Sequence, residues 1–77
     1  MTASTLSHRD VEFLKAVADG RVELTASSEP HVYVDGLSCC DQFGARLLIH
    51  AGLVRRVPGT GARIPAKLTD AGRDAIR

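Results

Sequence analysis

The hydrophobic positions of this 77-residue chain change their spacing several times along its length. Between Ser7 and Asp19 they recur every three or four residues, which is typical of an amphipathic helix. Ser7 precedes this pattern as an N-cap with Asp10 three residues on, and Gly20 follows it as a stop. The spacing therefore predicts a first helix over residues 7–19.

Residues 21–37 change to a period of two, which is typical of strands. Val22 and Leu24 alternate with polar residues, as do Val32 and Val34 after a turn-rich segment at residues 26–30. We expect a β-hairpin here, or one strand followed by an extended segment, ending at an Asp-Gly turn at residues 35–36.

Helical spacing returns over residues 38–51, with a cap signature at residues 38–41 and Gly52 as the end. One face of this second helix is apolar, and we expect it to pack inward. That face comprises Cys40, Phe43, Gly44, Leu47, Leu48 and Ala51. The residues on or beside the opposite face are Asp41, Gln42, Ala45, Arg46, Ile49 and His50.

Residues 53–68 predict a second hairpin, and Thr69 is the cap of a last helix. The tip is Pro58-Gly59-Thr60-Gly61, and the second strand alternates inward apolar residues with outward polar ones. Since Pro65 has no N–H, this strand is expected at an edge of the sheet or paired on one side only. The predicted class is α+β, with the order α-β-β-α-β-β-α.

The stretch from Leu53 to Arg73 resembles the end of a winged helix-turn-helix domain of the MarR or PadR type. In that family the recognition helix stops at a glycine, a basic hairpin called the wing follows, and a Leu-Thr-x-Ala-Gly-Arg step begins the next helix. The chain has these features at Gly52, at residues 53–68 and at residues 68–73. The resemblance implies a small winged-helix-like domain that binds DNA, with helix 38–51 as recognition helix. Residues 21–37 depart from the family, because a short helix normally stands there.

Charge is unevenly distributed in a chain whose net charge is only +1. Acidic residues predominate in residues 1–52 and basic residues in residues 53–77. A polarised domain of this kind can present a basic face to phosphate, although charge also fluctuates by chance in short chains.

Eight side chains are candidates for DNA contact. Glutamine and arginine are the types that pair with base edges, and basic side chains beside a glycine-rich tip suit phosphates. The candidates on the helix are Gln42, Arg46 and His50, and those on the wing are Arg55, Arg56, Thr60, Arg63 and Lys67. A solvated helix face and a solvated basic hairpin are the alternative interpretations.

DNA binding in transcription regulation is therefore the predicted function, with a cytoplasmic location. The alternative is a winged-helix scaffold for protein–protein contact or homodimerisation without DNA binding. The acidic first half, the missing helix and Ile49 favour that alternative.

Length and composition limit the other classes of function. At this length we expect one domain over residues 6–77 and a disordered N-terminus over residues 1–5. No membrane partner, small-molecule substrate or cofactor is indicated, and no catalytic motif supports an enzyme. Cys39 and Cys40 are adjacent, too close for an ordinary disulfide, and lack metal-ligand spacing. We expect Cys40 to pack as a small hydrophobic residue.

Overall fold

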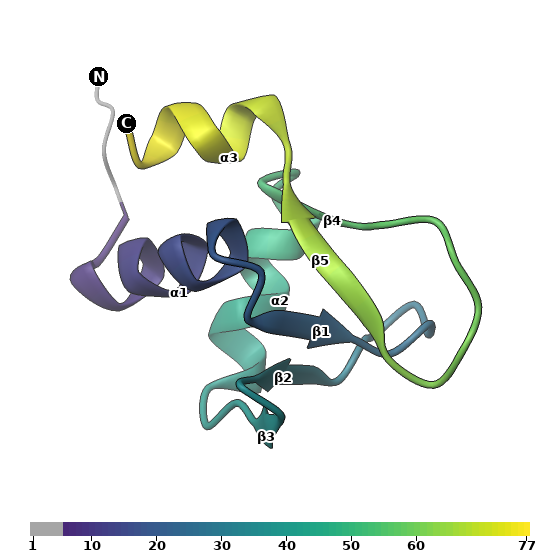
Figure 1. Ribbon diagram of the computed structural model, residues 1–77. Helices are drawn as coiled ribbons and strands as arrows, with labels where there is room; N and C mark the ends of the chain where they lie inside the picture. Colours follow the sequence, from purple (N-terminus) through teal and green to yellow (C-terminus); the bar gives the residue numbers. More distant parts are fainter. Residues whose placement is uncertain (1–5) are drawn as a thin grey trace.

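The structure, a computed structural model, describes residues 6–77 as three helices and a five-stranded antiparallel sheet (Figure 1). The α+β class is confirmed, and the strand order in the sheet is β3-β2-β1-β5-β4. The expectation of disorder for residues 1–5 lies outside the described residues. The elements are α1 (His8–Ala18), β1 (Val22–Leu24), β2 (Val32–Val34), β3 (Leu37–Ser38), α2 (Gln42–His50), β4 (Val54–Arg56), β5 (Ile64–Leu68) and α3 (Asp70–Ala75).

The first helix begins where the sequence predicts. Ser7 Oγ accepts a hydrogen bond from the backbone N–H of Asp10 (3.1 Å), and the Asp10 carboxylate accepts one from the N–H of Ser7 (3.2 Å). This capping box satisfies two N–H groups that the first turn leaves without helical partners. Leu14 and Val17 are buried on the face that α1 turns to the sheet.

The β-rich segment after α1 contains one strand more than predicted. Asp35 and Gly36 both have positive φ (55° and 82°), which suits the tight turns of β-hairpins. This turn returns Leu37 and Ser38 alongside β2, where they pair with Val34 and Tyr33. The predicted start of the second helix at residue 38 is therefore wrong. The cap of α2 is Asp41, whose Oδ1 accepts from the N–H of Gly44 at 2.9 Å.

The prediction of an edge or one-sided position for β5 is also wrong, because β5 lies between β1 and β4. In an antiparallel strand the N–H and C=O of one residue point toward the same neighbour. The carbonyl of Pro65 accepts from the N–H of Val57 (3.0 Å), so its missing N–H also faces the loop end of β4. The pairing of β5 with β1 therefore loses no hydrogen bond. The missing N–H of Pro65 costs one hydrogen bond, at the end of the β4–β5 ladder.

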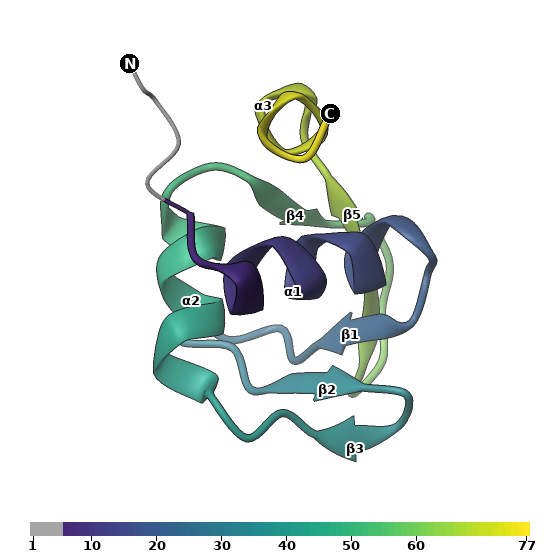
Figure 2. The same ribbon diagram turned by 90° about the vertical axis from the view of Figure 1, so that its left-hand side faces the viewer.

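The core lies between the helices and one face of the sheet. Figure 2 shows α1 in front of the sheet and α2 beside it. Strand alternation places the other residues of the sheet on the opposite face, which is open to solvent along β4 and β5. The buried cluster comprises Leu14, Ala16, Val17, Val22, Leu24, Val32, Ala45, Leu48, Val54, Ala66 and Leu68.

The last helix is fixed to the end of α2 through Thr69. Its hydroxyl donates to the carbonyl of Gly52 (2.6 Å) and accepts from the N–H of Gly72 (3.1 Å). The N–H of Thr69 also donates to the carbonyl of Leu53 at 3.0 Å. The predicted cap at Thr69 is confirmed, and these bonds fix the direction in which the β4–β5 hairpin leaves the helices.

Candidate nucleic-acid interface

The clearest cationic surface is on the outward side of the β4–β5 hairpin. Arg55 and Lys67 are direct cross-strand partners. Both are exposed, and they point away from Val54 and Leu68, which are buried. Within residues 6–77, no ion pair or side-chain hydrogen bond involves either residue. Two like charges face each other at this position without an ion pair to either of them within residues 6–77, an arrangement that costs free energy in a sheet.

The cationic surface extends from Lys67 toward α3. A groove of about 520 Å³ runs between the end of α1, β5 and α3, and Lys67, Arg73 and Arg77 are among its lining residues. Arg73 and Arg77 pair with Asp70 and Asp74 at 3.5 and 3.3 Å, so α3 contributes less unbalanced charge than the hairpin.

The tip of the hairpin projects from the molecule. Figure 1 shows the connection between β4 and β5 extending away from the helices. Residues 58–63 are exposed, Thr60 among them, and Gly61 has a φ of 120°, which favours glycine. The tip therefore presents backbone and small side chains that can approach another molecule closely.

Arg63 does not extend freely from the hairpin as the sequence analysis expects for a DNA contact. Its guanidinium lies over the ring of Tyr33, 3.8 Å from the centroid, and 3.9 Å from a carboxylate oxygen of Glu23. The cation–π contact and the nearby carboxylate hold this charge against the open face of the sheet. His31 is next to Tyr33 (ring centroids 4.8 Å apart) and lies 2.7 Å from the Ser38 hydroxyl. Sequence reasoning missed this group because it joins three different strands and the loop before β5.

Arg46, His50 and Arg56 surround the loop between β1 and β2. Arg46 Nε donates to the carbonyl of Pro30 at 2.9 Å. Arg56 donates from one nitrogen to the carbonyls of Thr25 (3.0 Å) and Ser27 (2.9 Å). His50 Nε2 lies 3.5 Å from Glu29. These three candidates are together, but on the opposite side of the hairpin from Arg55 and Lys67, so the eight candidates do not form one continuous surface.

Gln42 is turned inward rather than toward solvent. Its amide oxygen accepts from the N–H of Val32 (2.8 Å), and its amide nitrogen donates to the carbonyls of Val32 (2.9 Å) and Cys39 (2.8 Å). The expectation that Gln42 is exposed is wrong: the residue is half-buried, because its polar atoms join α2 to β2.

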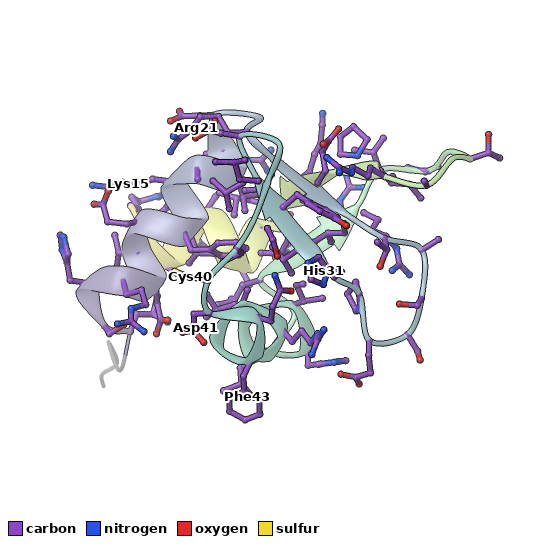
Figure 3. All side chains as sticks on the ribbon, turned by 90° about the horizontal axis from the view of Figure 1, so that it is seen from below. Lys15, Arg21, His31, Cys40, Asp41 and Phe43 are labelled. Carbon is purple, nitrogen blue, oxygen red and sulfur yellow. The ribbon has the colours of Figure 1, made fainter. Side chains whose placement is uncertain are left out.

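The face that α2 buries differs from the predicted one. Ala45 and Leu48 are buried, while the side chains of Phe43 and Leu47 are exposed, with relative exposures of 73% and 53%. In Figure 3 Phe43 projects from α2 away from the rest of the molecule. The inward contacts of Gln42 are consistent with this rotation, because Ala45, Leu48 and Ile49 pack into or against the core on the same side of the helix.

Nearby hydrogen bonds stabilise the ionised carboxylate of Asp41 at the start of α2. The pKa of Asp41 lies below its ordinary value, mainly because the N–H of Gly44 donates to the carboxylate and also because Arg9 donates to it at 3.3 Å. A carboxylate at this position also stabilises the positive end of the helix dipole.

The expectation that Cys40 packs as a small hydrophobic residue is wrong, because the chain turns Cys39 toward the core instead. Cys39 is half-buried against the core and Cys40 is exposed, both as free thiols. Residues 6–77 contain no cluster of three or more His, Cys, Asp or Glu side chains that would hold a metal. None of the helices described for residues 6–77 has the length and apolar character needed to cross a bilayer.

In comparisons with known proteins, no family model, no curated protein and no solved structure matched this chain.

Proposed function

We propose that this protein binds duplex DNA through the outward side of its β4–β5 hairpin, as a small regulator of transcription. The observation that carries the proposal is the cross-strand pair Arg55 and Lys67, exposed and without an acidic partner within residues 6–77. Two adjacent exposed cations on paired strands can each contact a phosphate, and phosphate contacts supply most of the affinity of non-specific DNA binding.

The surroundings of the pair support the same role. The exposed tip at residues 58–61 carries two glycines and Thr60, so a nucleic-acid backbone can approach it closely. On the other side, the rim of the groove adds Arg73 and Arg77. The resemblance of residues 53–73 to the wing of winged helix-turn-helix domains favours DNA over other polyanions.

The helix α2 contributes less to the proposed DNA binding than the family resemblance implies. Gln42 is occupied by Val32 and Cys39, and the most exposed large side chains on this helix are Phe43 and Leu47. Arg46 and His50 lie at the β1–β2 loop, where only Nε of Arg46 has a hydrogen-bond partner within residues 6–77, so its two terminal nitrogens can donate to a phosphate. Binding by one copy is therefore expected to be weak, strongly salt-dependent and insensitive to base sequence.

A role in protein–protein contact is the second candidate, and a separate observation favours it. Phe43 and Leu47 form an apolar pair on α2 that nothing within residues 6–77 covers. This surface lies on a different element from Arg55 and Lys67, so the two roles do not exclude each other.

A pair of matched variants tests the DNA proposal. Lys67→Gln removes one charge from the hairpin, and Lys15→Gln removes the same charge from α1, where Lys15 lies 3.7 Å from Glu12. Titration of a labelled random-sequence duplex by fluorescence anisotropy at low salt is the measurement. We expect Lys67→Gln to weaken binding several-fold and Lys15→Gln to leave it within about twofold. Equal effects of the two variants would contradict the proposed surface.

A further inference from the structure

The groove between the end of α1, β5 and α3 has an apolar lining that the proposed DNA contact does not use. Its volume is about 520 Å³, and pockets for small organic molecules have volumes of about 300–1,000 Å³. Figure 1 and Figure 2 show α3 above α1, with β5 leading up into α3. The aliphatic residues that line the groove are Val17, Ala18, Pro65, Ala66, Leu68 and Ile76. Burial of such a surface favours an alkyl chain rather than a phosphate backbone.

The charged side chains that line the groove are all cations. They are Lys67, Arg73 and Arg77, and none of the acidic residues in residues 6–77 is part of the lining. Lys67 has no ion pair within the same residues. The acidic partners of the two arginines, Asp70 and Asp74, are exposed and outside the lining, and exposed ion pairs of this kind are weak. The groove therefore combines an aliphatic floor with a cationic rim.

We propose that this groove binds a free amphiphile with one alkyl chain and an anionic head, of the class of the medium-chain fatty acids. The alkyl chain lies on the aliphatic floor and the carboxylate lies at Lys67. The cationic rim selects an anion over an uncharged amphiphile of the same length. No aromatic residue among residues 6–77 lines the groove, so an alkyl chain fits it better than a flat ring that binds by stacking.

The aliphatic floor makes affinity depend on the length of the chain. Each fully buried CH₂ group increases affinity by about fourfold. Because the groove is open to solvent on one side, we expect a several-fold increase from octanoate to decanoate. This site goes beyond the proposed DNA binding and does not depend on it, since the floor takes no part in the DNA contact.

Titration of the isotopically labelled full chain, followed by NMR chemical shifts without DNA, tests the site. The ligands are octanoate, decanoate and 1-octanol, each below the concentration at which it aggregates. We expect saturable shifts centred on Ala18 and Ile76, with octanoate binding several-fold more tightly than 1-octanol. Equal affinities for octanoate and 1-octanol, no saturable shifts, or shifts centred on Phe43 and Leu47 would overturn the proposal.

Two matched alanine variants locate the site independently. Ala18 is the last residue of α1, is exposed and lines the groove, whereas Ala51 is exposed at the C-cap of α2, outside the groove. Ala18→Glu adds a negative charge to a lining that has none, so we expect decanoate to bind at least about tenfold more weakly. Ala51→Glu should leave its affinity within about twofold, and circular dichroism should show both variants folded. Equal effects of the two substitutions would contradict the assigned groove.

A vesicle experiment distinguishes a free fatty acid from a membrane surface. The two glutamate variants are sedimented with phosphatidylglycerol vesicles, and we expect them to bind equally, because the groove takes no part in that contact. Vesicle binding that Ala18→Glu alone weakens, together with no response of the wild type to free decanoate, would overturn the proposal in favour of a lipid surface. These measurements contain no DNA, so their outcome is independent of the test of duplex binding.

Discussion

The side-chain amide of Gln42 pairs with the backbone of Val32 as a neighbouring strand would. Gln42 Oε1 accepts from the N–H of Val32 at 2.8 Å, and Gln42 Nε2 donates to its carbonyl at 2.9 Å. Val32 is fully buried, so this contact satisfies backbone groups that water does not reach. It joins the start of α2 to β2 and sets which face of the helix is exposed.

Replacing Gln42 should therefore destabilise the fold. We expect Gln42→Ala to lower the free energy of unfolding by about 1–3 kcal/mol, because it removes the partner of a buried N–H group. Gln42→Glu should lower it further, since a carboxylate would face the carbonyls of Val32 and Cys39. Urea unfolding followed by circular dichroism measures both. A change below about 0.5 kcal/mol for Gln42→Ala, together with weaker DNA binding, would support base reading instead.

Gly72 should tolerate no side chain, because α3 approaches the end of α2 closely there. A Cβ at this position would collide with the backbone carbonyl oxygen of Leu53 and would lie 3.2 Å from Leu68 Cδ2. A carbonyl fixed by its bond from Thr69 cannot move aside cheaply. We expect Gly72→Ala to lower the free energy of unfolding by at least about 1–3 kcal/mol, as overpacking does.

The matched control for that substitution is Gly59→Ala. A Cβ at Gly59 meets no atom within 4 Å, and the residue has no positive φ. Thermal unfolding should show a clear loss for Gly72→Ala and little change for Gly59→Ala. A Gly72→Ala protein as stable as the wild type would contradict the described contact with Leu53.

Asp41 should make the free energy of unfolding depend on pH in the acidic range. Its pKa is lowered in the folded state by the N–H of Gly44 and by Arg9, so its ionised form is bound more tightly than in the unfolded chain. This contribution is complete above the ordinary aspartate pKa of about 3.9 and is lost as the pH falls through the lower folded pKa.

Asp41→Asn keeps a capping oxygen and removes the charge. We expect the wild-type protein to be more stable than the variant at pH 7, with the difference shrinking as the pH falls below about 4. Urea unfolding at a series of pH values measures it. A constant difference from pH 7 down to pH 2 would show that the charge of Asp41 contributes nothing.

The sequence was sufficient for the elements whose signals are local. The capping box at Ser7, the Asp35-Gly36 turn, the inward alternation of β5 and the cap at Thr69 each depend on residues close together in the chain. Such contacts form within a few residues, so local spacing reports them.

The rotation of α2 could not be predicted in the same way. Phe43 and Leu47 fit an inward apolar stripe by spacing alone, but the long-range packing of Ala45 and Leu48 into the core, together with the pairing of Gln42 with Val32, turns them outward. Long-range contacts also explain why the eight candidate DNA-contact residues do not lie together. Arg46 and Arg56 donate to carbonyls of the β1–β2 loop, whose residues are far from them in the sequence. A polar side chain at helical spacing is equally compatible with a solvated face, a base contact or an internal bond.

The most direct test of the DNA-binding account is the salt dependence of duplex affinity for the wild type and for Arg55→Gln with Lys67→Gln. The slope of log Kobs against log salt concentration changes by about 0.9 for each phosphate contact. We expect the double variant to bind more weakly and its slope to be shallower by about 1.8. An unchanged slope, or no binding of folded wild-type protein at about 50 mM salt, would contradict it.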